Sequence, residues 1–156
     1  TKIEDNEGNV IATFQPRMNE GISETSANKM LVELQAVVNE GTARRLRFKY
    51  NLKGEIGGKT GTTNRNADAW FMGFTPELGS GCWVGGEDRD IHFDSMSMGQ
   101  GATMALPIWA YFMQKVFAGP RLGYTQKATF DLPEGFDPCA RDDGGMNEYG
   151  IDEVYE

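Results

Sequence analysis

Residue types on which many enzymes depend are scarce in this sequence. His92 is the only histidine, and the two cysteines, Cys82 and Cys139, lie 57 positions apart. A single imidazole argues against a multi-histidine metal site and against a Ser-His-Asp triad. The cysteines also lack the C-x-x-C spacing of zinc sites. We therefore expect no metal and no cofactor, a loop position for His92, and two free thiols.

Long apolar runs are missing as well. No stretch approaches the roughly 20 residues that a membrane-spanning helix needs, and no signal peptide is present. The chain opens on Thr1, directly in strand-like sequence, so we expect an excised piece of a longer protein. The missing signal then says little about where the longer protein resides. A length of 156 residues, 39% hydrophobic and 24% charged, fits one globular domain.

Positive charge is nearly absent from the end of the chain. Residues 131–156 hold nine of the 23 acidic residues but only one of the 15 basic ones, so they account for the whole net charge of −8. Such a segment, with few aliphatic residues, cannot bury enough apolar surface to order itself well. We expect a neutral unit over residues 1–130 and an acidic, mobile tail over 131–156; a partner-binding tail is the minor alternative.

Periodicity predicts a hairpin followed by a helix. Residues 3–14 place apolar residues on two short arms around the turn-forming run "DNEG". Residues 23–41 then carry apolar residues at helical spacing, with Ser23 as N-cap and Gly41 as the C-terminal stop. Six residues of this helix are expected to face the protein core: Ala27, Met30, Leu31, Leu34, Val37 and Val38.

Three short strands and a closing helix complete the pattern. The strands are expected around 56–62, 69–74 and 82–86, separated by the turn-rich runs "NRNAD" and "PELGSG". Residues 99–120 read as a helix ended by Gly119-Pro120, with Pro107 at a kink or near its regular start. Its predicted buried residues are Leu106, Trp109, Phe112, Met113 and Val116. This order predicts an α+β fold, an antiparallel sheet with packed helices.

Residues 57–63, "GGKTGTT", place one lysine among residues with almost no side-chain bulk. One interpretation is a flexible glycine-rich loop. The other is a sheet edge against which a ligand backbone can lie, with Lys59 and the hydroxyls of Thr60, Thr62 and Thr63 facing an anion. K-T-G, together with S-x-x-K and S-D-N, marks serine β-lactamases and penicillin-binding proteins, although three residues alone carry little weight.

The surrounding sequence carries much more than the tripeptide. The runs "LQAVVNEGTARRLRFKYNLKGEIGGKTGTTNRNADAWFMGFTPEL", "CWVGGED" and "GQGATMALPIWAYFM" occur in this order. Together they resemble the C-terminal part of the transpeptidase domain of class A penicillin-binding proteins, over residues 1 to about 130. The resemblance implies a β-lactamase/transpeptidase-like fold, present here as its C-terminal portion.

The resemblance also implies roles for the K-T-G residues. A substrate would lie antiparallel to this strand, so bulk at Gly57, Gly58 or Gly61 would obstruct it. Lys59 would supply positive potential near the nucleophile and the substrate carboxylate. The hydroxyls of Thr60 and Thr62 would bind that carboxylate, and the Thr62 N–H would form half of the oxyanion hole. Gly58 and Thr63 are counted with the substrate-binding residues.

The chain departs from the family where the nucleophile is concerned. The family's S-x-x-K lies well over a hundred residues before K-T-G, with S-x-N between them, and this chain begins too late for either. "SANK", Ser26 to Lys29, has the right spacing, but Lys29 lies only thirty residues before Lys59 and no S-x-N separates them. We interpret Ser26 as a first-turn serine and Lys29 as an exposed lysine, so the chain alone is expected to be inactive.

Two further groups of residues have ordinary explanations. The basic cluster between 44 and 49 could suggest nucleic acid, but a solvated connection suits so acidic a chain better. The tryptophans Trp70, Trp83 and Trp109 fall on core-like positions and are interpreted as packing residues. No nucleic-acid partner is expected. The members of the basic cluster are Arg44, Arg45, Arg47 and Lys49.

These observations predict one wall of the cleft of a serine D,D-transpeptidase. The longer protein would cross-link peptidoglycan stem peptides through an acyl-enzyme and be acylated by β-lactams. It would be anchored on the periplasmic face of the bacterial inner membrane, with or without a glycosyltransferase domain. The alternatives are a non-catalytic binding or assembly module and a serine β-lactamase-like hydrolase. Expected partners are the rest of the transpeptidase domain and, for the isolated chain, a second copy of itself.

Overall fold

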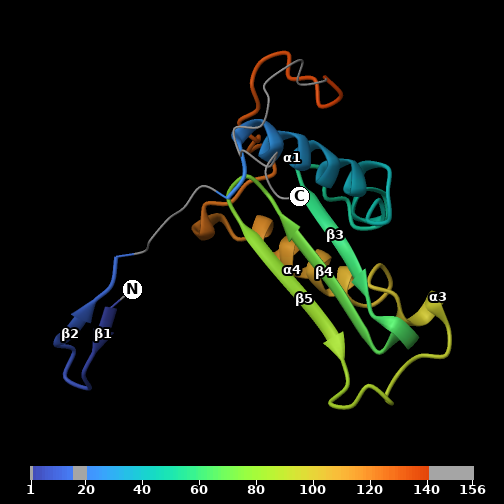
Figure 1. Cartoon of the computed structure of the whole chain (residues 1–156), viewed down its shortest axis with the longest axis horizontal. Coiled ribbons are helices and arrows are strands. Elements are labelled where there is room, and N and C mark those ends of the chain that lie inside the picture. The colour runs from blue at the N-terminus through green and yellow to red at the C-terminus, as the bar shows by residue number, and fades with distance from the viewer. Residues whose placement is uncertain (1, 16–20, 141–156) are drawn as a thin grey trace, which may run out of the picture.

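The computed structural model describes residues 2–15 and 21–140. Its first element is the predicted hairpin, β1 (Lys2–Glu4) and β2 (Val10–Thr13), which Figure 1 shows standing apart from the other elements. The Asp5 carboxylate fixes the turn by accepting the backbone N–H groups of Glu7 and Asn9 at 2.9 and 2.8 Å. Hydrogen bonds to this carboxylate, that of the Asn9 side chain first, lower the pKa of Asp5. The hairpin is thus specified locally by its turn.

Helix α1 (Glu24–Asn39) begins and ends where the sequence predicts. Ser23 caps it by accepting the N–H of Ser26 at 3.3 Å, and the N–H of Gly41 returns to the carbonyl of Ala36 at 3.0 Å. A Cβ at Gly41 would lie 2.9 Å from the backbone of Val37, so this close turn requires glycine. The short helix α2 (Arg45–Phe48) follows directly.

The sheet is a three-stranded antiparallel meander with the order β3-β4-β5. Its strands are β3 (Gly57–Thr62), β4 (Asp68–Phe74) and β5 (Gly79–Gly85). A 3₁₀ turn, η1 (Asn64–Asn66), joins the first two, with Arg65 and Asn66 at positive φ. All three strands were predicted, but β5 begins at Gly79 rather than Cys82. The turn before it is shorter than expected, because Thr75 closes it by bonding to Leu78.

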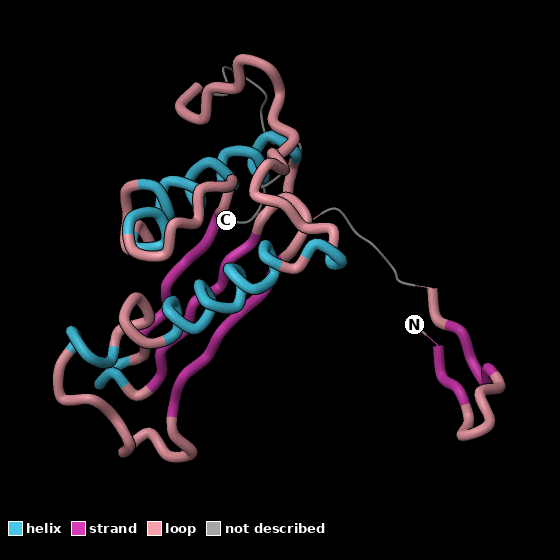
Figure 2. The backbone as a smooth tube through the Cα atoms, turned by 180° about the vertical axis from the view of Figure 1, so that it is seen from behind, coloured by secondary structure: helices cyan, strands magenta, loops and turns pink. Residues whose placement is uncertain are grey.

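Helix α4 (Ala105–Ala118) crosses one face of the sheet, as Figure 2 shows from behind. The ring of Trp109 meets that of Phe71 edge-on at 5.1 Å, and its indole N–H donates to Ser80 Oγ at 2.8 Å. Pro107 lies in the first turn, where its missing N–H costs little. The helix is shorter than predicted, because Gly99 belongs to a separate short helix, α3 (Met96–Gly99), and residues 100–104 form a bend and turns.

The core gathers on the helix-covered face. Its fully buried side chains come from α1, α2, β4, α4 and the segment before β3, and a last 3₁₀ turn, η2 (Pro120–Leu122), follows α4. None of the described helices combines the length and apolar character needed to cross a membrane. The largest buried side chains are Trp109, Phe71, Leu46, Leu52, Ile56, Leu106, Met113 and Val38.

Some core predictions are wrong. Met30 and Phe112 are exposed, since each lies at the margin of its helix's apolar stripe. Trp70 and Trp83 are 45% and 48% exposed, because they lie on the sheet face that no described helix covers. Trp109, at 1% exposed, is the packing residue predicted. Of the predicted acidic tail, residues 131–140 contain two short turns and neither helix nor strand, and 141–156 lie outside the described residues.

Candidate functional site

The "GGKTGT" strand, β3, forms one edge of the described sheet. It pairs with β4 through the register Gly57↔Phe74 to Thr62↔Ala69, and no described strand lies on its other side. Figure 1 shows β3 as the outermost strand, with α1 close to it. The flexible-loop interpretation is therefore wrong: the stretch is a regular edge strand.

The register determines which backbone groups point away from the sheet. Just beyond the strand, the N–H of Thr63 donates to the carbonyl of Asp68 at 3.0 Å. Hydrogen-bonded and non-bonded pairs alternate along an antiparallel ladder. The N–H and C=O groups of Gly58, Thr60 and Thr62 consequently point to the free edge. We call these outward groups the β3 edge; Thr62 N–H, the predicted half of the oxyanion hole, belongs to it.

Side chains alternate between the two faces of this strand. Thr60 lies opposite Phe71, which packs on α4, and Lys59 lies opposite Met72 on the uncovered face. Thr60 and Thr62 thus share the helix-covered side, and Lys59 and Gly61 share the other. Lys59 is exposed, and its ammonium donates to the Thr60 carbonyl of the β3 edge at 2.9 Å. The lysine therefore already lies beside an outward acceptor of this edge.

The threonine hydroxyls have partners from outside the strand. Thr60 Oγ1 lies 2.9 Å from Thr42 Oγ1, in the turn between α1 and α2. Thr62 Oγ1 accepts the N–H of Gly101 at 3.1 Å. Thr63 faces the β3–β4 turn instead: its hydroxyl accepts the Asp68 N–H at 2.8 Å and lies 3.2 Å from the Asp68 carboxylate. Thr63 is thus part of the turn rather than of the edge.

The glycines around β3 differ in what they exclude. A Cβ at Gly58 would lie 2.9 Å from the Met72 carbonyl and the Phe71 ring, and one at Gly57 would enter the Phe74 ring. At Gly61 the nearest atom would be Trp70 Cβ at 3.1 Å. Gly57 and Gly58 are therefore required by packing inside the fold. Gly61 has more freedom, which leaves the access of a ligand as a reason for its small size.

The uncovered face of the sheet is apolar beside Lys59. Trp70 and Trp83 are neighbours across β4 and β5, with ring centroids 6.4 Å apart, and Met72 is 53% exposed. The Trp83 indole N–H donates to Asp68 Oδ1 at 3.0 Å, which fixes the ring on this face. We call Trp70, Met72 and Trp83 the open face. Its apolar character suits contact with another protein surface.

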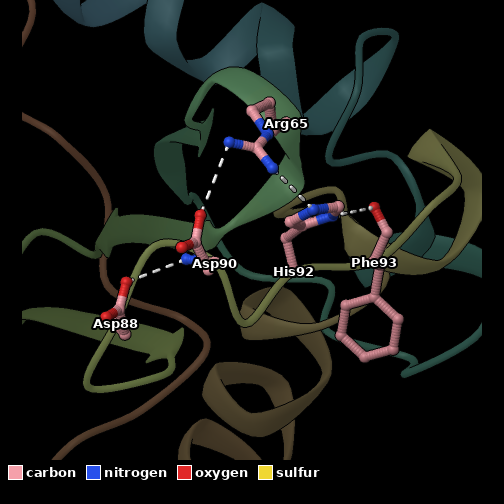
Figure 3. Close-up of polar contacts among 5 residues, drawn as sticks. All are labelled: Arg65, Asp88, Asp90, His92 and Phe93. Carbon is pink, nitrogen blue, oxygen red and sulfur yellow. Dashed lines mark hydrogen bonds and ion pairs between the residues drawn. The ribbon is translucent and has the colours of Figure 1, made fainter.

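The predicted loop position of His92 is confirmed. Its Nε2 lies 3.2 Å from Arg65 Nη2, and Arg65 also approaches the Asp90 carboxylate at 3.6 Å, as Figure 3 shows. His92 Nδ1 lies 3.4 Å from the Phe93 carbonyl. These contacts join the β3–β4 turn to the loop after β5. His92 and Phe93 also line an open pocket of about 420 Å³, together with Ala67, Val84, Gly85, Gly86, Ile91 and Met104.

The remaining candidates lie apart from the β3 edge. Ser26 accepts a hydrogen bond from Ser23 at 3.0 Å at the start of α1, and Lys29 donates to the Ala140 carbonyl at 3.0 Å, so the two side chains bind different partners. No three metal-ligating side chains cluster within residues 2–15 and 21–140. Cys82 is half-buried and burial raises the pKa of its thiol, whereas Cys139 is exposed; both are free.

The basic cluster was expected to be a solvated connection, and this is wrong for Arg47, which is half-buried and hydrogen-bonded. Its guanidinium donates to the carbonyls of Leu52 and Gly54 at 2.8 and 2.6 Å and to Asn39 Oδ1 at 3.0 and 2.7 Å. Burial lowers the pKa of this arginine. The side chain therefore binds the segment before β3 to the helices, and only Arg44 and Lys49 of the cluster are exposed.

The sequence did not reveal the supports of the β3 edge. Thr42, Gly101 and Asp68 contact its hydroxyls or its turn from three separate segments. The only hints were the turn "EGTA" after a helix and the closely spaced glycines of "GQGA". Neither hint says which strand these residues would meet.

Comparisons with known proteins give one consistent result. The chain is 39% identical over 115 residues to penicillin-binding protein 1A of Aquifex aeolicus, and 35% identical over 143 residues to that of Neisseria gonorrhoeae. These matches cover 74% and 86% of the chain but 15% and 16% of the relatives. The chain thus spans about a sixth of the length of the curated relatives it matches. No protein-family model matches it.

A solved structure agrees with the sequence matches. The crystal structure of penicillin-binding protein 1A from Haemophilus influenzae superposes with a TM-score of 0.51 at 27% identity. The superposition covers 64% of this chain and 15% of that protein. The antiparallel sheet with packed helices is therefore the fold found in this part of that relative.

Proposed function

Because the chain belongs, over the region that it spans, to the class A penicillin-binding proteins, we propose that it forms one wall of the cleft of a peptidoglycan D,D-transpeptidase. The protein that joins this wall to the nucleophile is called the complete protein below. It would attack the D-Ala-D-Ala terminus of a stem peptide through a serine acyl-enzyme and be acylated by β-lactams. We place it on the periplasmic face of the bacterial inner membrane, anchored by a segment outside this chain.

The observation that carries this proposal is the β3 edge. Its outward N–H and C=O groups at Thr60 and Thr62 can pair with an extended peptide, which would add a strand to the sheet and take the place of Lys59 at the Thr60 carbonyl. The positive charge of Lys59 and two threonine hydroxyls lie on the same short stretch. A peptide that ends in a carboxylate suits both features, because its backbone matches the strand and its terminus matches the cation and the donors.

The nucleophile of this reaction is proposed to come from outside the chain. Ser26 and Lys29, the one pair with suitable spacing, bond within the start of α1 and to Ala140. The open face, beside Lys59, is proposed to pack against the remainder of the transpeptidase domain, which would bring the serine to the lysine. Burial of Trp70, Met72 and Trp83 would stabilise that contact by removing apolar surface from water.

Labelling with a fluorescent penicillin tests the proposal. The chain alone should form no covalent adduct, and the complete protein should form one per molecule, which intact mass measures. Lys59→Ala in the complete protein should slow acylation by about two orders of magnitude or more, because it removes a charge that acts in a water-poor cleft.

Lys53→Ala is the matched control, since Lys53 is also exposed but lies before β3. It should acylate at the wild-type rate. An adduct on Ser26 of the chain alone would contradict the proposed source of the nucleophile. A complete protein without any adduct would instead favour a non-catalytic module, and rapid turnover of the adduct would favour a β-lactamase.

A further inference from the structure

The hydroxyls of Thr60 and Thr62, on β3, each form a hydrogen bond with a residue from another segment. Thr42 Oγ1 lies 2.9 Å from Thr60 Oγ1, and the N–H of Gly101 donates to Thr62 Oγ1 at 3.1 Å. These two segments are themselves joined, because Arg45 Nη1 donates to the Ala102 carbonyl at 3.3 Å. The turn that carries Thr42 and the segment that carries Gly101 are therefore connected to each other as well as to β3.

The position of Thr42 is set by the end of α1. The N–H groups of Gly41 and Ala43, on either side of it, donate to the carbonyls of Ala36 and Val37, both at 3.0 Å. Ala43 is completely buried, and Gly41 approaches the Val37 backbone too closely for any other residue. Thr42 itself is exposed. Because the turn holds the Thr42 hydroxyl in place, this hydroxyl can set the orientation of the Thr60 hydroxyl that it contacts.

The number of hydroxyl hydrogens decides which of the two threonines donates to the other. A hydroxyl has one hydrogen to donate and two lone pairs to accept with. The contact between Thr42 and Thr60 uses one hydrogen, which either residue can supply. When Thr60 donates its hydrogen to an anion, the hydrogen of this contact must come from Thr42. The Gly101 N–H leaves the hydrogen of Thr62 free in the same way.

We propose that Thr42 is a positioning residue of the ligand site: it donates its hydroxyl hydrogen to Thr60 Oγ1, so that Thr60 donates to the carboxylate of the ligand. The inference rests on the proposed function, since it names a support of the same edge. Thr42 touches no reacting atom. Its effect should therefore depend on the carboxylate and act only through the Thr60 hydroxyl.

The test compares acylation of the complete protein by benzylpenicillin and by its methyl ester, which lacks the carboxylate charge. Thr42→Val removes the hydroxyl but keeps the shape, and should slow acylation by the acid about fivefold, the effect of one hydrogen bond. Acylation by the ester should stay at the wild-type rate. Thr42→Ser, which keeps the hydroxyl, should restore the rate with the acid.

Two controls separate this role from a structural one. Thr25→Val, at the opposite end of α1, should change neither rate. In a Thr60→Val background, Thr42→Val should cause no further loss. An equal loss with acid and ester, no loss with the acid, or a further loss in the Thr60→Val background would overturn the inference. A wild-type protein that benzylpenicillin does not acylate would contradict the proposed function itself, and the inference would fall with it.

Discussion

The glycines around β3 are required for different reasons, and only the structure distinguishes these reasons. The sequence shows that "GGKTGT" lacks bulk, and it leaves two explanations open, a flexible loop and room for a ligand. The fold shows that Gly57 and Gly58 are enclosed by Phe74, Phe71 and the β4 backbone, whereas Gly61 is less confined. Gly101, forty positions away, supports this strand. No pattern in a sequence states which backbone will approach a distant glycine.

Gly101 should tolerate no side chain. A Cβ there would overlap the carbonyl oxygens of Trp70 and Gly61, and these backbone atoms cannot move without breaking the β3–β4 ladder. Gly101→Ala should lower the free energy of unfolding by about 2–4 kcal/mol. Urea denaturation followed by tryptophan fluorescence measures this. Gly79→Ala is the control, because its nearest neighbour would be 3.9 Å away, and it should change stability by less than about 1 kcal/mol. Equal stability of both variants would show that the 100–104 segment is not packed on β3.

At the scale of elements, local signals in the sequence predicted most of the architecture. The turn at Asp5, the cap at Ser23 and the stops at Gly41 and Gly119 all lie where expected. The three strands of the sheet were expected as well, but the sequence could not say that only one face of the sheet has described helices on it. From their core-like positions in the sequence, Trp70 and Trp83 are therefore interpreted as packing residues, whereas the structure leaves both exposed. The fold class was thus predictable, and the covering of each face was not.

Arg47 connects three elements and should not be replaceable by lysine. Its planar head donates to two carbonyls before β3 and to Asn39 at the end of α1. A lysine ammonium cannot reach all three acceptors at once. Arg47→Lys should therefore lower the free energy of unfolding by about 1–3 kcal/mol. Thermal and urea unfolding would measure it against Arg44→Lys, whose side chain is exposed and which should remain close to wild type. A loss no larger than that of the Arg44 variant would contradict the connecting role.

For the molecule as a whole, the main feature is its uncovered apolar surface. The open face lies beside an unpaired strand edge, and α4 adds Ile108 and Phe112, 53% and 47% exposed. Residues 1–130 carry no net charge to oppose association. Apolar patches and free strand edges of this kind favour contact between protein chains.

The isolated chain should therefore self-associate. Light scattering during size-exclusion chromatography should find species heavier than the 17.3 kDa monomer, increasing with concentration. Met72→Glu, on the open face, should reduce the association. Met30→Glu is matched to it, since Met30 is exposed to almost the same degree but lies on α1, and it should not. Association that survives Met72→Glu would point to the β3 edge or to exchange of the N-terminal hairpin. One monodisperse 17.3 kDa species over a wide concentration range would contradict the prediction.

The most direct test of the central claim is a crystal structure of the complete protein acylated by benzylpenicillin. The claim is that the ligand adds to the β3 edge of this chain. The acyl group should then form backbone hydrogen bonds with the N–H or C=O of Thr62, and its carboxylate should lie within hydrogen-bond distance of the hydroxyl of Thr60 or Thr62. An acyl group bound elsewhere, with residues 57–63 free of contact, would contradict the account.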